Sequence, residues 1–226
     1  MIEFLKNLGI GIATAFQGVP MTLFVTIIAV ICGLLIGFLI AFMRMSRFKP
    51  LNVIAMVYTD ILRGTPLLVQ VLIFAYGIPA LIQSMGIQFK WPTLLIPAII
   101  CCTLNSSAYM GEIVRSGLQA IDIGQREAAA SLGMTHSQAQ RLIVIPQAVR
   151  IILPPLGNEF VTMIKETAIL SYVAIEEITL KGALLAAKTF EFFTAYGGVA
   201  IVYLIFTIPL SKFVLYLEKR LDVDSK

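Results

Sequence analysis

The sequence predicts an all-α membrane protein with about five transmembrane helices. Its 226 residues are 58% hydrophobic and only 13% charged, and the mean hydropathy is +0.91. Soluble domains are ordinarily about one-quarter charged. Several apolar segments reach the roughly 20 residues that a helix needs to cross about 30 Å of hydrocarbon. The ten-residue alternation of a membrane barrel is not seen, so helices are the expected spanning elements.

Five apolar segments are expected to span the bilayer, at residues 19–43, 65–84, 92–115, 147–173 and 196–217. The fourth is the least regular, because Pro154 and Pro155 interrupt it and polar residues fill its second half.

Two shorter helices are expected in the connections, an amphipathic one at 51–62 and another within 175–193. No repeat or linker is visible, so residues 1–226 are interpreted as a single membrane domain.

The first 18 residues are predicted to form an amphipathic helix that lies in the membrane interface. The alternative is a cleaved signal segment, because Ala13-Thr14-Ala15 resembles a cleavage site. Glu3 offsets the charge of Lys6, however, and a full-length span follows at once, which favours the helix.

Basic residues near span ends predict the orientation, since they stay preferentially in the cytoplasm. The connections after spans one, three and five hold most of them: Arg44, Arg47, Lys49, Arg63, Arg115, Arg126, Arg141, Arg150, Lys212, Lys219, Arg220 and Lys226, against Lys6, Lys90, Lys181 and Lys188 on the other side. The N-terminus is therefore expected outside and the C-terminus inside. The net charge of +4 comes without a basic run, which disfavours nucleic acid as a partner.

A polar, alanine-rich insert separates two apolar spans at about 122–146. Asp122 and Gln125 have capping-box spacing, so a helix should start there, with the glutamine reaching back. It should end at Gly133, which offers the left-handed conformation that commonly terminates helices. Thr135 and Gln138 repeat the spacing and predict a second helix.

Two interpretations of the insert remain open. Ala128, Ala129 and Ala130 keep the first helix thin, so a partner surface could approach it closely and the insert could be a docking element. The alternative is an ordinary amphipathic connector on the membrane surface.

The insert resembles the EAA loop of permease subunits of ABC importers, with Ile145 where leucine is commoner. In that family the loop forms a coupling helix that sits in a groove of the ATPase subunit. The resemblance therefore assigns ATPase coupling to a set of residues here: Glu127, Ala128, Ala129, Gly133, Ile143 and Pro146.

Further motifs resemble the polar amino acid uptake branch, whose members include histidine, glutamine and arginine permeases. They are RGTPLLVQ at 63–70, PLGNEF at 155–160 and KET at 165–167. The resemblance implies a type I ABC importer-like permease fold in the bacterial cytoplasmic membrane.

The resemblance also implies partners. The chain has no G-x-x-x-x-G-K-[ST] segment, so no cofactor is expected on it, and ATP and Mg²⁺ would be bound by separate ABC ATPase subunits. A second permease chain, as a homodimer or heterodimer, and an extracytoplasmic substrate-binding protein are implied beside the amino acid and the lipid bilayer. The chain itself is expected to be no enzyme.

Polar residues inside spans two, three and four form a candidate substrate pathway: Gln70, Asn105, Ser106, Tyr109, Glu159, Thr162, Lys165 and Glu166. A charge at mid-bilayer costs on the order of 2.5 to 3.5 kcal/mol on insertion scales, so such groups should face protein or water. Glu159 is expected to attract an ammonium or guanidinium group, which favours cationic amino acids. The alternative for Lys165 and Glu166 is that they lie near the outer interface and satisfy each other or a neighbouring helix.

Other polar residues have local explanations. Glu112 and Arg115 are three apart and should form an ion pair. His136 is interpreted as an exposed residue of the insert, and the cysteines have no metal-ligand spacing, so neither a catalytic nor a metal site is expected.

The alternatives are an ABC permease for another small polar solute and three other classes of protein. An autonomous secondary transporter should show inverted repeats or more spans. An intramembrane enzyme needs a nucleophile or metal set, and a membrane scaffold would only recruit a cytoplasmic partner.

Overall fold

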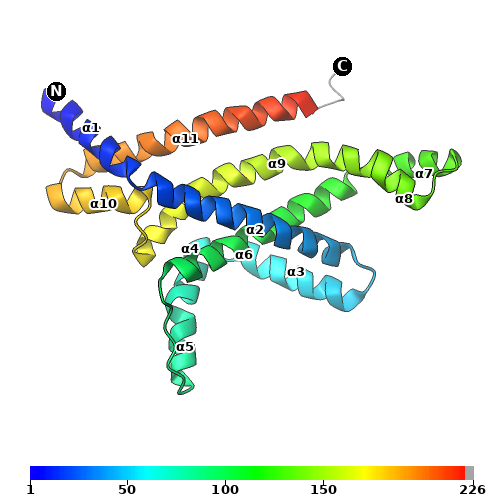
Figure 1. Ribbon diagram of the computed structural model, residues 1–226, viewed down its shortest axis with the longest axis horizontal. Helices are drawn as coiled ribbons and strands as arrows, with labels where there is room; N and C mark the ends of the chain where they lie inside the picture. Colours follow the sequence, from blue (N-terminus) through cyan, green and yellow to red (C-terminus); the bar gives the residue numbers. More distant parts are fainter. Residues whose placement is uncertain (222–226) are drawn as a thin grey trace.

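The computed structural model describes residues 1–221, and no β-strand occurs among them. Figure 1 shows long helices that run side by side, with shorter helices at the two ends. In chain order the elements are α1 (Ile2–Phe16), α2 (Val19–Met45), α3 (Lys49–Gly64), α4 (Leu67–Leu72), the π-helical turn η1 (Ile73–Gly77), α5 (Ile78–Ser84), α6 (Leu95–Gln119), α7 (Ile123–Ser131), α8 (His136–Ala139), the π-helical turn η2 (Gln140–Val144), α9 (Ile145–Glu166), the 3₁₀ helix η3 (Thr167–Val173), α10 (Ile178–Thr189) and α11 (Phe192–Leu221).

The helices agree with the predicted all-α membrane fold. Within residues 1–221, three stretches are long and apolar enough to cross a membrane: Ile2–Met45, Leu67–Ser84 and Phe192–Leu221. The other two predicted spans are α6, with 25 residues, and α9, with 22. These two contain the intramembrane polar residues, which lower their hydropathy.

The most extensive helix pair is α2 with α6, and glycines at the contact allow it. A side chain at Gly33 would lie 3.1 Å from Ser106, and one at Gly37 would lie 2.9 Å from the backbone nitrogen of Gly111. The sequence numbers rise together along both helices, so α2 and α6 run in the same direction. Spans one and three must be parallel if successive spans alternate across the membrane.

The directions of α9 and α11 agree with the same alternation. Ile152 of α9 contacts Gly117 of α6, whereas Glu159 lies near Ser106, so α9 runs against α6. Figure 1 shows the C-terminal ends of α2, α6 and α11 at one end of the molecule, together with α7 and α8. The basic connections named above therefore share one end, apart from Lys226, which lies outside the described residues. The orientation of that end toward the cytoplasm stays a prediction.

The opposite end is built from α1, α10 and the start of α11. The predicted N-terminal helix forms as α1 and packs along α11, where Gly11 allows the backbone of Thr194 to approach. Glu177 is fully buried and caps α10, accepting hydrogen bonds from the backbone N–H groups of Thr179 and Leu180 and from the Tyr203 hydroxyl. Burial raises the pKa of the Glu177 carboxyl, and these hydrogen bonds oppose the shift.

The second half of the second predicted span, α5, stands apart from the long helices. Figure 1 shows α5 extending away from them, and no residue of α5 is buried. The Trp91 indole donates to the carbonyl of Phe74 at 2.9 Å and ties the following connection back to this span.

Prolines shape the helices without ending them. Each π-helical turn ends two residues before a proline, η1 before Pro79 and η2 before Pro146. A proline has no N–H and clashes with the carbonyl four residues earlier, so a widened turn accommodates it. Pro154 and Pro155 lie inside α9, which continues through both.

Candidate functional site

The insert between α6 and α9 begins with a capped helix. The Asp122 carboxylate accepts a hydrogen bond from the backbone N–H of Gly124 at 2.6 Å, so the predicted N-cap is confirmed. The predicted return contact from Gln125 is wrong. Its side-chain oxygen accepts from the Gln147 amide at 3.4 Å instead, because the start of α9 offers a donor next to α7.

The turn between α7 and α8 has the predicted geometry. Gly133 has a φ of +76°, the left-handed conformation that favours glycine. Thr135 and Gln138 then form a complete capping box, in which Gln138 N–H donates to Thr135 Oγ1 at 3.3 Å and Thr135 N–H donates to Gln138 Oε1 at 2.8 Å. Local hydrogen bonds therefore fix both helices of the insert.

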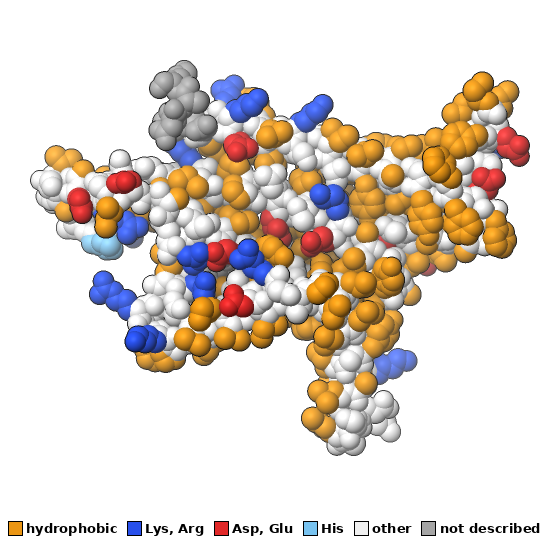
Figure 2. Space-filling model, turned by 180° about the vertical axis from the view of Figure 1, so that it is seen from behind, with side chains coloured by type: hydrophobic (Ala, Val, Ile, Leu, Met, Phe, Trp, Pro, Cys, Tyr) orange, Lys and Arg blue, Asp and Glu red, His pale blue; other side chains and the backbone are white. Residues whose placement is uncertain are grey.

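The insert presents a thin surface with exposed apolar side chains. Ala129 is buried, whereas Glu127 and Ala128 on the same helix are exposed. Leu132 and Leu142 are 81% and 66% exposed, so neither is covered by another part of residues 1–221. Figures 1 and 2 show the insert projecting beyond the long helices, with the single histidine on it. We call residues 122–146 the coupling element, after the role in ATPase coupling that is predicted for them and stays a prediction.

The last two predicted coupling residues connect this element to span four. Ile143 is half-buried in η2 and Pro146 is exposed in the first turn of α9. Since α8, η2 and α9 follow one another without a break, a displacement of the coupling element would be transmitted directly to α9.

Two of the predicted pathway residues, Gln70 and Asn105, form one hydrogen-bonded group. The Asn105 amide donates to Gln70 Oε1 at 3.1 Å and lies 3.3 Å from the carbonyl of Leu62. The Gln70 amide donates to the same carbonyl at 2.7 Å and lies 2.8 Å from the Thr65 hydroxyl. Leu62 lies in the last turn of α3, where carbonyls have no intrahelical partner. These amide donors therefore stabilise the turn from α3 to α4, and their predicted contact with substrate is not tested by this geometry.

Ser106 and Glu159 meet across α6 and α9. The Ser106 hydroxyl lies 3.5 Å from Glu159 Oε1, and the Glu159 residue is only 9% exposed. Within residues 1–221 the ion pairs are Glu112 with Arg115 and Glu176 with Lys181, so Glu159 has no cationic partner there. A buried carboxylate with a single hydroxyl donor can accept further hydrogen bonds from a ligand.

The remaining predicted pathway residues are less enclosed. Tyr109 and Thr162 are half-buried, and Glu166 is half-buried beside the exposed Lys165. Lys165 and Glu166 form no ion pair with each other among the described residues, and the alternative that each is satisfied by its neighbour or by another helix stays a prediction. They are successive residues of a helix, and neighbouring side chains there point in different directions.

The predicted pair of Glu112 and Arg115 is confirmed, with Arg115 Nε 2.9 Å from Glu112 Oε2. Within the described chain, no group of three or more His, Cys, Asp and Glu residues could hold a metal ion.

Comparison with known proteins shows the family of this chain. Residues 33–223 match the family described as binding-protein-dependent transport system inner membrane component. The chain belongs to this family. It is therefore a membrane permease and a transport component rather than an enzyme.

Similar proteins cover most of the permease. A probable glutamine ABC transporter permease protein, GlnM of Bacillus subtilis, is 38% identical over 202 residues, which are 89% of this chain and 90% of the relative. The arginine transport system permease protein ArtQ of the same organism is 32% identical over 205 residues, 91% of each chain. A crystal structure of an amino acid ABC transporter with histidines has a chain that is 41% identical, with a TM-score of 0.83, covering 92% of this chain and 94% of that one. The expected type I importer-like permease fold is confirmed.

Three polar residues of the permease join the site although the predicted pathway set omitted them. The Arg63 guanidinium lies 5.1 Å from the centre of the Tyr109 ring and places a positive charge beside the polar face of α6. Tyr58 donates to the carbonyl of Leu104 at 3.1 Å and lies 2.6 Å from the Ser107 hydroxyl. Figure 2 shows acidic and basic side chains gathered in the middle of one face, between apolar surfaces.

The sequence contains features that could have pointed to Arg63 and Tyr58. Arg63 opens the RGTPLLVQ motif, and Tyr58 lies one turn before Leu62 on the amphipathic helix. Their contacts with α6 join residues more than 40 positions apart, and helical spacing alone does not specify such pairs.

Proposed function

We propose that this chain is the membrane-spanning subunit of an ATP-driven importer for polar amino acids. The observation that carries the proposal is the unbroken connection between an exposed coupling element and α9, which holds the buried Glu159. The names of the relatives, which specify glutamine, arginine and amino acid transport, support the same substrate class.

The coupling element would bind a separate ATPase subunit. Exposed Leu132 and Leu142 provide apolar contact, while the small side chain of Ala128 allows close approach. ATP and Mg²⁺ would be held by that partner, and its opening and closing would move α7 and α8. Because α8 leads through η2 into α9, this motion would change the access to Glu159.

Glu159 would receive the positively charged group of the substrate. Its carboxylate is buried, is touched by the Ser106 hydroxyl, and has no cationic partner among the described residues. This arrangement favours a cationic side chain, such as that of arginine, over a neutral one. A neutral amino acid still carries an ammonium group, so the preference is a difference of degree.

The assembly would contain a second permease chain and an extracytoplasmic substrate-binding protein. The surface of α5, where no residue is buried, is available to another membrane helix. In this assembly the N-terminus lies outside and the C-terminus inside, as the basic residues at the end that holds the coupling element favour.

The testing experiment purifies the tagged chain from membranes in mild detergent and identifies the proteins that accompany it. A double variant, Glu127→Lys with Gly133→Val, alters the coupling element. The matched control, Glu218→Lys, makes the same charge change at an exposed site on α11. An ATPase that accompanies the wild type and the control, but not the double variant, is the expected result.

Two results would contradict the proposal. An ATPase retained equally by the double variant would remove the coupling role. Amino acid flux through liposomes that contain this chain alone would favour the autonomous secondary transporter instead.

A further inference from the structure

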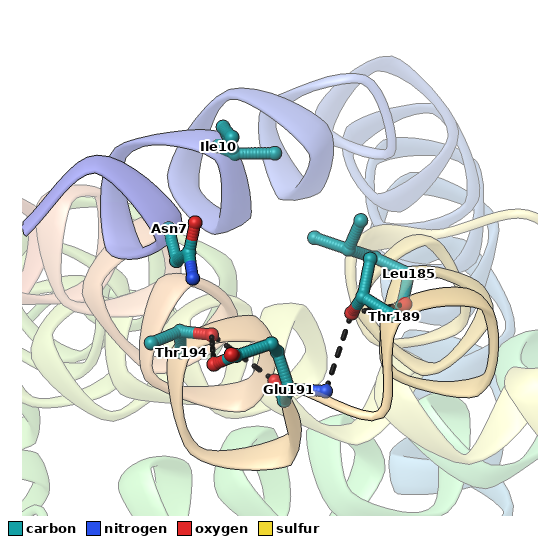
Figure 3. Close-up of a pocket in the computed structure, with 6 residues that line it drawn as sticks. All are labelled: Asn7, Ile10, Leu185, Thr189, Glu191 and Thr194. Atoms are coloured by element: carbon teal, nitrogen blue, oxygen red, sulfur yellow. Dashed lines mark hydrogen bonds between the residues drawn. The ribbon is translucent and has the colours of Figure 1, made fainter. Parts of the chain in front are cut away.

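A cavity of about 150 Å³ lies at the end of the molecule opposite the coupling element. Figure 3 shows that α1, α10 and α11 surround it, with these lining residues: Asn7, Ile10, Leu185, Thr189, Glu191 and Thr194. Sites for drug-sized ligands usually measure roughly 300 to 1,000 Å³, and a water needs roughly 10 to 15 Å³. The cavity therefore suits a small chemical group better than a whole drug-sized ligand.

The polar lining is rich in hydrogen-bond acceptors and includes one negative charge. The Thr194 hydroxyl is 3.1 Å from the carbonyl of Glu191 and 3.3 Å from its carboxylate, and the Glu191 N–H donates to the Thr189 hydroxyl at 3.3 Å. Glu191 is exposed and forms no ion pair within residues 1–221. Asn7 lies on the opposite wall, with its amide nitrogen toward Thr194 (Figure 3). The Glu191 carboxylate and the two threonine hydroxyls match a primary ammonium group, which donates three hydrogen bonds and accepts none.

The backbone is shaped to hold this lining together. Phe190 ends α10 in the left-handed conformation, with a φ of 59°, and its N–H donates to the carbonyl of Ala186 at 2.8 Å. Bulky residues seldom adopt this conformation. The reversal lets Thr189, at the end of α10, and Glu191, just before α11, line the same cavity.

The surroundings of the cavity indicate where its ligand comes from. Phe190 and Phe193 are 79% and 77% exposed, and the Phe4 ring lies 5.9 Å from that of Phe193. Tyr196, one turn into α11, is 43% exposed, and tyrosine is enriched where a membrane meets water. Figure 2 shows apolar side chains crowded beside acidic ones at this end. The apolar surface suits acyl chains, and the cavity beside it suits a head group.

We propose that this cavity binds the primary ammonium head group of a membrane lipid, with Glu191 as its counter-ion. Phosphatidylethanolamine has that group. Phosphatidylcholine has the same charge, but its methylated nitrogen donates no hydrogen bond. Comparing the two lipids separates recognition through hydrogen bonds from simple attraction of charge.

The test reconstitutes the full chain, with whatever subunits co-purify, in nanodiscs of equal phosphatidylethanolamine and phosphatidylcholine content. Native mass spectrometry then counts the retained lipids. Wild type should retain phosphatidylethanolamine preferentially. Glu191→Gln should lower that preference about tenfold, because the charge-assisted hydrogen bond from the ammonium group to the carboxylate is replaced by a weaker one to a neutral amide oxygen, and phosphatidylcholine forms neither. Glu3→Gln is the matched control. Glu3 is exposed like Glu191, but it lies on α1 and does not line the cavity.

A second variant, Leu185→Trp, fills the cavity and keeps the carboxylate. It should also abolish the preference. Equal retention of the two lipids by wild type, or an unchanged preference in Glu191→Gln, would overturn the proposal. It would equally fail if Glu191→Gln leaves lipid retention intact and weakens binding of a soluble substrate-binding protein, because the cavity would then receive a lysine of that protein.

Discussion

The coupling element and the polar group between α6 and α9 are built in opposite ways. In the coupling element, the two helix caps join near neighbours, Asp122 with Gly124 and Thr135 with Gln138. In the polar group, Ser106 meets Glu159 across 53 residues of sequence. A locally built element can be moved by a partner without unfolding, whereas the polar group depends on how the long helices pack. Changes to the first should therefore affect coupling, and changes to the second should affect substrate binding or stability.

The largest effect is expected from Gly133→Val. A β-branched residue at a φ of +76° is strained by roughly 1 to 2 kcal/mol or more, and the strain is confined to the coupling element. ATP-driven uptake in proteoliposomes should fall more than tenfold while the chain stays folded in the membrane. Gly9→Val, on an exposed glycine of α1 with free space around it, is the control. Undiminished uptake by Gly133→Val would contradict the coupling role.

Glu159→Gln should separate two substrates. Loss of the buried negative charge is expected to lower arginine uptake about tenfold or more, and glutamine uptake by much less, because only arginine presents a second cationic group. Uptake of both labelled amino acids is measured on the same preparations. Glu218→Gln removes an exposed charge far from the site and should change neither. Equal losses for the two amino acids would argue against a cationic preference.

Gln70 and Asn105 test whether the polar residues bind substrate or support the fold. Since their amides hold the carbonyl of Leu62, either change to alanine should lower the free energy of unfolding by about 1 to 3 kcal/mol. The double variant should lose less than the sum of the two, because the residues also bond each other. Thermal unfolding in detergent measures this. A changed KM for uptake with full stability would show a role in substrate binding instead.

The smallest effect is expected from Thr135→Ala, which removes one N-cap. The stability of α8 should fall by about 1 kcal/mol, and the other helices should not be affected. Hydrogen exchange should become faster at Gln138 and its neighbours, with the Tm of the whole chain unchanged. A lower Tm would show that the coupling element is tied to the long helices more strongly than its local hydrogen bonds indicate.

Sequence reasoning succeeded where the deciding contacts are local. The Thr135–Gln138 box, the left-handed Gly133 and the ion pair of Glu112 with Arg115 all depend on residues within one or two helical turns. It failed for Gln125, whose spacing matched a capping box while a donor from α9 was nearer.

The sequence by itself determined the helical membrane fold, the five long apolar segments and the two-helix insert, because hydropathy over 20 residues and cap spacing are properties of a short stretch of chain. Only the tertiary structure decided that Gln70 and Asn105 secure the α3–α4 turn. The same is true of Glu159, whose carboxylate is hydrogen-bonded by the Ser106 hydroxyl. It also decided that Asn7, Thr189 and Glu191 line one cavity. These groups come from different helices. Their neighbours are therefore set by how the helices pack, and between α1 and α11 glycine allows the close approach.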